Sequence, residues 1–179
     1  MGIFEIALLA IALSMDAFAV AVCAGLSGGR AKISTMLTVG LYFGIAQAVM
    51  PIIGFFLAAW FSNYIAAYSG IVAFAILVFL GVKMIWGSFK KGENECIDIS
   101  PSKMLPLAVA TSIDAMAVGV SFVFLEVNVF MAALFIGVTT FVLSAIGVKV
   151  GSLFGTRFKS AAELMGGVIL VVMGIGALG

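Results

Sequence analysis

Residues 12–22 read ALSMDAFAVAV, and residues 110–120 read ATSIDAMAVGV. Each stretch carries one aspartate, Asp16 or Asp114, in the middle of an apolar segment with the length of a helix. An ionised carboxylate at the centre of a bilayer costs roughly 2.5–3.5 kcal/mol on insertion scales. A single carboxylate at such a position must therefore have a role that offsets this cost. Two carboxylates in matching surroundings indicate a common role. The simplest shared reason is a cation-binding site to which both carboxylates contribute.

The composition is that of an integral membrane protein. Of the 179 residues, 64% are hydrophobic and 9% are charged, and none is histidine. Soluble domains carry about 25% charged residues, and a spanning helix needs about 20 mostly apolar residues. We therefore expect an all-α protein with six transmembrane helices near residues 3–25, 33–58, 65–87, 104–124, 129–152 and 161–178.

The break between the second and third helices is marked by aromatic residues rather than by charge. No charged residue occurs between Lys32 and Lys83. Trp60, Tyr64 and Tyr68 lie in this stretch, and such amphipathic rings favour the headgroup level of a bilayer. We therefore predict the connection at residues 59–64.

The basic residues fix the predicted orientation. The loops 26–32, 88–103 and 153–160 lie on one side of the six spans, and the connections 59–64 and 125–128 on the other side hold no lysine or arginine. The positive-inside rule places the first set of loops in the cytoplasm and both termini outside. The basic residues of these loops are Arg30, Lys32, Lys90, Lys91, Lys103, Arg157 and Lys159.

Two further lysines lie inside predicted helices, within about two turns of their cytoplasmic ends. The long side chains of Lys83 and Lys149 can reach the interface from such positions, and this is the interpretation that we favour for both. For Lys149, a role as a movable counter-ion for an aspartate is the alternative.

The two halves of the chain are related to each other. A shift of 98 residues aligns the first helix with the fourth, and a shift of 97 aligns the second with the fifth. The matched pairs include Ser14 with Ser112, Asp16 with Asp114, Gly40 with Gly137, Gln47 with Ser144 and Gly54 with Gly151. We assign residues 1–89 and 104–179 to two three-helix repeats and residues 90–103 to a cytoplasmic connecting loop. Because each unit has three spans, the second enters from the opposite face, as in many secondary transporters.

Helical spacing selects candidate ligands beside the aspartates. Cys23 shares a face with Asp16, and Thr111 and Ser121 share a face with Asp114. Ser14 and Ser112 project from another face, and we expect their hydroxyls to bond back to their own helices.

A proline in the second predicted helix adds a further candidate ligand. Pro51 lacks an N–H and so frees the carbonyl of Gln47, whose side chain brings a second carbonyl oxygen. Irregular backbone at membrane depth is tolerated where it lines a cavity. An ordinary packed kink is the alternative interpretation.

The residue types indicate the class of ion. Carboxylate, amide and hydroxyl oxygens with at most one thiol, and without histidine, suit Mn²⁺ or Mg²⁺ better than zinc or copper. Two aspartates balance a divalent charge when the site is loaded. When it is empty they should repel and take up protons, which would allow exchange of metal for protons. No prosthetic group and no nucleic-acid partner are expected.

The two motifs, LSMDAFAV at residues 13–20 and ATSIDAMAVG at residues 110–119, resemble those of the MntP family of bacterial manganese exporters, in the LysE-type transporter superfamily. The resemblance covers the whole length. It implies Mn²⁺ efflux across the bacterial plasma membrane, no enzymatic activity, and intramembrane acidic residues at Asp16 and Asp114.

Other functions fit the sequence less well. An intramembrane aspartyl protease also uses two aspartates, but it typically places one in a Gly-x-Gly-Asp context that is missing from both motifs. An exporter of another cation, or of a small amino acid, is the closer alternative. An amino acid would need a cationic partner for its carboxylate, and no arginine lies at mid-helix.

Reporter tags test the predicted orientation. A tag at residue 95 should report the cytoplasm, whereas tags at either terminus should report the exterior, because the basic residues lie in loops on one side only. Compartment-specific fusion reporters in intact cells provide the measurement. A cytoplasmic C-terminus would contradict the inverted repeat.

Overall fold

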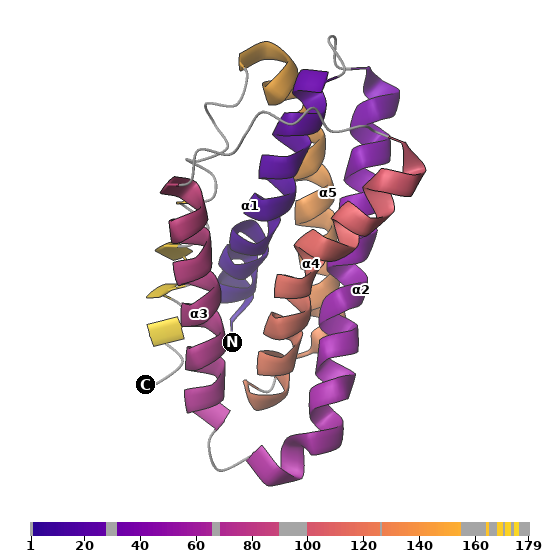
Figure 1. The fold of residues 1–179 in the computed structure, drawn as a ribbon. Helices are drawn as coiled ribbons and strands as arrows, with labels where there is room; N and C mark the ends of the chain where they lie inside the picture. Colours follow the sequence, from indigo (N-terminus) through magenta and orange to yellow (C-terminus); the bar gives the residue numbers. More distant parts are fainter. Residues whose placement is uncertain are drawn as a thin grey trace.

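The computed structural model describes residues 2–27, 32–65, 69–89, 100–125 and 127–154, together with the separate residues 164, 168–169, 171–172 and 174–175. Within these ranges the chain forms five helices (Figure 1). They are α1 (Ile3–Ser27), α2 (Ile33–Ile65), α3 (Ser69–Phe89), α4 (Pro101–Phe124) and α5 (Val129–Phe154). The sixth predicted helix, near 161–178, lies mostly outside the described residues.

Four of these helices are long and apolar enough to cross a membrane, over Ile3–Gly25, Ile33–Trp60, Ser102–Phe124 and Val129–Leu153. Large apolar side chains also face outward on them, among them Leu41 and Ile45 on α2 and Leu134 on α5. Such a surface suits lipid, and a helix satisfies its own backbone hydrogen bonds there. The prediction of an all-α membrane protein is confirmed, whereas crossings by α3 and by a sixth helix stay predictions.

The helix ends differ from the predicted ones where the local chemistry allows a longer helix. α2 continues through Trp60 to Ile65, so the connection predicted at 59–64 is wrong. Pro51 lies inside this helix, since a proline removes one backbone hydrogen bond without ending a helix that packing supports. α4 begins at Pro101, three residues earlier than predicted, because proline is pre-organised for the first helical turn.

The helices pair across the two halves of the chain. α1 packs along α5, and α2 packs along both α4 and α5. Figure 1 shows α1, α3 and α5 running in one direction and α2 and α4 in the other. α1 and α4, the helices that carry the repeated motif, therefore point in opposite directions. The inversion itself stays a prediction, and this arrangement agrees with it.

Glycines bring the paired helices into backbone contact. A Cβ added to Gly25 of α1 would overlap the backbone of Val148, and one added to Gly151 of α5 would overlap the carbonyl of Val22. In a membrane, where lipid is as apolar as leucine, such close approach is a main source of helix association. The α1–α5 spacing is therefore set by main-chain atoms.

The α2–α4 pair repeats this contact. Gly54 of α2 lies against the carbonyl of Met116, and Gly119 of α4 lies against the backbone of Pro51. Each of these contacts has a counterpart between α1 and α5. The contact of Gly54 with Met116 matches that of Gly151 with Val22, and the contact of Gly119 with Pro51 matches that of Gly25 with Val148.

The glycine contacts relate α1 to α4 by a different residue offset than the aspartate motifs do. Gly25 corresponds to Gly119 and Val22 to Met116, an offset of 94 residues, whereas the aspartate motifs are 98 residues apart. The difference of four residues is about one helical turn, or roughly 6 Å along the axis. The two aspartates are therefore displaced by one turn from equivalent positions in the packing.

Alanine substitutions at these glycines test the backbone contacts. Gly54→Ala and Gly119→Ala should each lower the free energy of unfolding by about 1–3 kcal/mol, because the helices must separate to admit the methyl group. Gly2→Ala is the control, since nothing lies within 4 Å of its added Cβ. Thermal unfolding in detergent gives the comparison, and unchanged stability of Gly119→Ala would exclude so close an approach.

Candidate functional site

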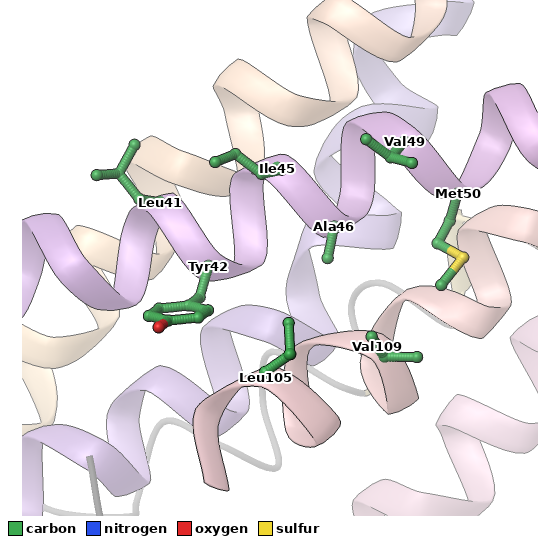
Figure 2. Close-up of a pocket in the computed structure, with 8 residues that line it drawn as sticks. All are labelled: Leu41, Tyr42, Ile45, Ala46, Val49, Met50, Leu105 and Val109. Atoms are coloured by element: carbon green, nitrogen blue, oxygen red, sulfur yellow. The ribbon is translucent and has the colours of Figure 1, made fainter. Parts of the chain in front are cut away.

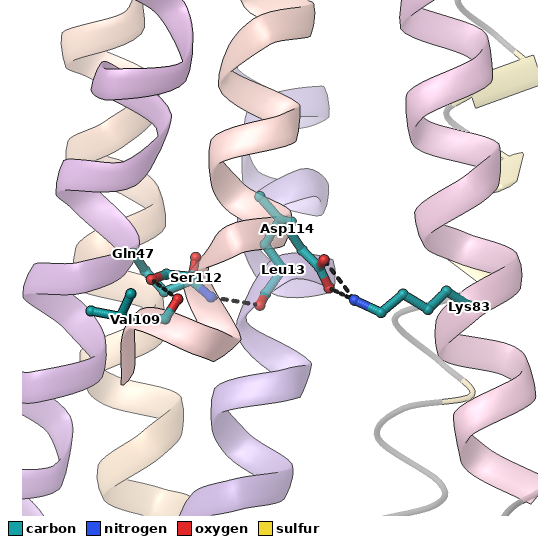
Figure 3. A network of polar contacts seen from close by, with 6 residues as sticks. All are labelled: Leu13, Gln47, Lys83, Val109, Ser112 and Asp114. Atoms are coloured by element: carbon teal, nitrogen blue, oxygen red, sulfur yellow. Dashed lines mark hydrogen bonds and ion pairs between the residues drawn. The ribbon is translucent and has the colours of Figure 1, made fainter. Parts of the chain in front are cut away.

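The clearest charged contact in the described residues joins α3 to α4. Lys83 Nζ donates to both carboxylate oxygens of Asp114, at 2.8 Å and 3.1 Å (Figure 3). The Asp114 side chain is 9% exposed, whereas that of Lys83 is 57% exposed. A buried carboxylate that lost such a partner would remain as an uncompensated charge in an apolar interior. The Lys83 ammonium therefore supplies the positive charge that faces the buried carboxylate of Asp114.

This contact corrects the interpretation of Lys83. The sequence suggested that its side chain reaches the membrane interface, but its ammonium turns to Asp114, across the space between α3 and α4 (Figure 3). Ionisable residues within membrane helices commonly pair with one another, but this rule does not say which aspartate Lys83 would meet. Lys149, the counter-ion that we considered instead, is exposed on α5.

Asp16 lies half-buried on α1. Its neighbour Met15 and the neighbour of Asp114, Ala115, belong to the same buried apolar cluster, together with Val118 of α4. The two motifs thus contribute to one core. Convergence of the two carboxylates on one ion stays a prediction.

Three buried side chains have oxygen atoms without a hydrogen-bond partner among the described residues. They are Gln47 Oε1, Ser121 Oγ and Ser144 Oγ. The other end of the Gln47 amide is fixed, because its Nε2 donates to the Leu13 carbonyl of α1 at 3.2 Å (Figure 3). Buried polar atoms are normally paired, so each of these oxygens is a candidate to meet a ligand. Gln47 and Ser121 were predicted as ligands, and Ser144 is the residue aligned with Gln47.

Other hydroxyls in the motifs are satisfied within the protein. Ser112 Oγ donates to the carbonyls of Ala108 and Val109, and Thr111 Oγ1 donates to the Ala108 carbonyl at 3.0 Å. The expected back-bonding of Ser112 is confirmed. Thr111 keeps only its lone pairs for a ligand.

Ser14 also bonds back to its own helix, as expected, but it does more. Its Oγ lies 2.6 Å from the Ala10 carbonyl and 2.7 Å from Thr140 Oγ1 of α5. The hydroxyl pair is buried and ties α1 to α5 close to Asp16. The Cys23 thiol, two turns further along α1, is half-buried.

A groove on the surface of the described residues lies in a different place. It has a volume of about 360 Å³ between α2 and α4, and apolar side chains line it, with Tyr42 supplying the single hydroxyl (Figure 2). An apolar groove has no ligand for a divalent cation. Leu41 and Ile45 at its edge are exposed, so it belongs to the outer, lipid-facing surface.

The described residues contain no group of three or more His, Cys, Asp or Glu side chains that could enclose a metal ion. The candidate residues in these ranges are two carboxylates on separate helices, Asp16 on α1 and Asp114 on α4, and three buried neutral oxygens without a described partner. Fold and site together define a multi-pass membrane protein in which a lysine of α3 pairs with a buried carboxylate of the spanning helix α4.

Comparison with known proteins gives the family. Residues 30–178 match the family Mntp, described as "Putative manganese efflux pump". A protein of that name from Desulfitobacterium hafniense is 49% identical over 177 residues, covering 98% of this chain and 93% of the relative. Relatives of the same name from Acetivibrio thermocellus and Mannheimia succiniciproducens are 43% and 45% identical, over 97% and 98% of this chain and 89% and 95% of their own lengths.

The chain therefore belongs to the manganese efflux pump family, MntP. The resemblance drawn from the two motifs is confirmed along nearly the whole sequence. The family is one of transporters, which agrees with the prediction that the protein is not an enzyme. No solved structure matches the fold.

Serine substitutions test whether the unpartnered oxygens are held at a cost to stability. Ser121→Ala should leave the free energy of unfolding unchanged or raise it by up to ~1 kcal/mol, because it removes a buried hydroxyl that has no hydrogen-bond partner in the described part of the chain. Ser14→Ala should lower it by ~1 kcal/mol, because Thr140 loses its partner. Thermal or denaturant unfolding provides both values, and a marked loss of stability in Ser121→Ala would mean that its hydroxyl is structural.

Proposed function

We propose that this chain exports Mn²⁺ from the cytoplasm across a bacterial plasma membrane by secondary transport, through a midplane site built on Asp16 and Asp114. The observation that carries the proposal is the buried carboxylate of Asp114, which is paired with a positive charge, here the ammonium of Lys83. Family membership supports Mn²⁺ as the cargo, because the relatives are named as manganese efflux pumps.

The available donors suit this ion. Gln47 Oε1 and Ser121 Oγ are buried oxygens that no described residue contacts by a hydrogen bond, and Mn²⁺ accepts carboxylate, carbonyl and hydroxyl oxygens. Thr111 and Cys23 are secondary candidates. A transported ion must also leave its site, so two carboxylates with neutral oxygens are better suited than a closed cage of charged ligands.

Alternating access follows from the proposed inverted repeat. The opposite directions of α1 and α4, and the pairing of each with a helix from the other half, support that arrangement. Rocking of one repeat against the other would open a midplane site to each side in turn. Exchange of Mn²⁺ for protons belongs to the proposal, because carboxylates that release a divalent ion must regain two positive charges, of which the Lys83 ammonium supplies one.

One observation favours a second candidate cargo. The Lys83–Asp114 pair presents an ammonium and a carboxylate together, which are the groups that a zwitterionic amino acid would need. In this structure the two groups neutralise each other. A small amino acid is therefore included among the cargoes to be tested.

Replacement of each aspartate by asparagine tests the site. Asp16→Asn and Asp114→Asn should each reduce Mn²⁺ efflux at least about tenfold, because loss of a charged ligand contact costs ~1.5–3 kcal/mol. Asp114→Asn should also lose stability, since it leaves Lys83 without its carboxylate. Efflux of Mn²⁺, Mg²⁺, Cd²⁺ and a small amino acid is measured in vesicles at equal protein abundance.

Ser112→Ala is the matched control for that experiment. Ser112 lies two residues from Asp114, and its hydroxyl is committed to its own helix, so Mn²⁺ efflux should stay close to the wild-type rate. Unchanged efflux in either asparagine variant would overturn the shared site. Export of the amino acid without Mn²⁺ would replace the proposed cargo.

A further inference from the structure

The ammonium of Lys83 lies where a bound cation would lie. It contacts Oδ1 and Oδ2 of Asp114 together, at 2.8 Å and 3.1 Å, so both carboxylate oxygens are engaged by a positive charge (Figure 3). A divalent ion on the same oxygens would place two like charges within a few ångströms of each other, which strongly disfavours joint occupancy. Lysine and metal therefore compete for Asp114.

We propose that Lys83 is a tethered placeholder for the cargo: it occupies the Asp114 carboxylate while the site is empty and leaves it when the divalent cation binds. The inference rests on the proposed function above, and it adds a residue from α3 that determines when the site is available.

The two partners differ in how easily they move. Asp114 is buried on α4 beside Ala115, which belongs to the buried apolar cluster, so its short side chain has little room to move. Lys83 is more than half exposed, and the contacts to Asp114 are its only hydrogen bonds and ion pairs in the described structure. Its four-carbon stem is flexible and its ammonium is a compact charge. The lysine is thus the partner that can move away.

A placeholder cation changes what an empty carrier can do. With Lys83 in place, the Lys83–Asp114 pair of the empty site carries no net charge. The empty transporter can then return to its cytoplasm-facing state without a bound metal ion. Without Lys83, the unfilled carboxylate would be uncompensated, which opposes that return. During exchange of one metal ion for another, a metal ion is bound to Asp114 in both transport steps. This exchange should therefore not require Lys83.

Two substitutions test the placeholder in the full-length protein reconstituted in vesicles. Lys83→Met removes the competing charge with little change in side-chain length, so Mn²⁺ should bind about tenfold more tightly, which corresponds to ~1.4 kcal/mol. Net Mn²⁺ efflux should fall several-fold, whereas exchange of isotopically labelled Mn²⁺ across the membrane should persist. Lys83→Arg keeps the charge and holds a carboxylate through two parallel hydrogen bonds, so Mn²⁺ should bind several-fold more weakly. Lys149→Met, on the exposed side of α5, is the matched control and should leave affinity and both transport rates unchanged.

The outcomes separate this inference from the proposed function. Wild-type affinity and net efflux in Lys83→Met would overturn the placeholder, and so would a loss of Mn²⁺ binding comparable with that of Asp114→Asn. If Lys83→Met does not fold, Lys83→Arg decides: weaker binding supports the placeholder, and unchanged or tighter binding overturns it. Failure of the wild-type protein to bind Mn²⁺ would overturn the proposed function, and the inference with it.

Discussion

The rest of the structure depends on the close approach of main chains at four glycines. Gly25, Gly54, Gly119 and Gly151 admit the backbone of a neighbouring helix where any side chain would overlap it. Hydrophobic burial cannot drive helices together inside lipid, so main-chain contact and van der Waals packing must do so. These contacts fix α1 against α5 and α2 against α4, and each pair takes one helix from each half. Ser14 of α1 and Thr140 of α5 then meet because the backbones that carry them are already fixed.

Within that frame, charge and polarity are compensated locally. Asp114 receives an ammonium from α3, and Ser14 and Ser112 use carbonyls of their own helices. Gln47 Oε1 and Ser121 Oγ depart from this pattern, since both are buried without a partner among the described residues. In a membrane such atoms cannot turn to water, so their retention is more understandable as part of a site than as part of the scaffold.

The sequence predicted local features of the structure. It did not predict most contacts between segments that are far apart in the chain. Asp16 and Asp114 stand out because an ionised group in an apolar helix is costly wherever that helix packs. The back-bonding of Ser112 follows from helix geometry alone. The partner of Asp114 could not be derived this way, because Lys83 lies 31 residues away and nothing in its own segment indicates which face of α3 meets α4. The 94-residue offset was likewise hidden, since aligned motifs report ancestry and not the register in which helices pack.

The exchange of helix partners between the halves also has a consequence for biosynthesis. α1 ends at Ser27, but the helix that it packs along, α5, begins at Val129, so more than 100 residues must be made before the pair can form. At about 5–20 residues per second, that interval lasts on the order of 5–20 s. During it α1 is without the helix against which its Gly25 packs. The main-chain contacts of α1 with α5 therefore form only after most of the chain has been made.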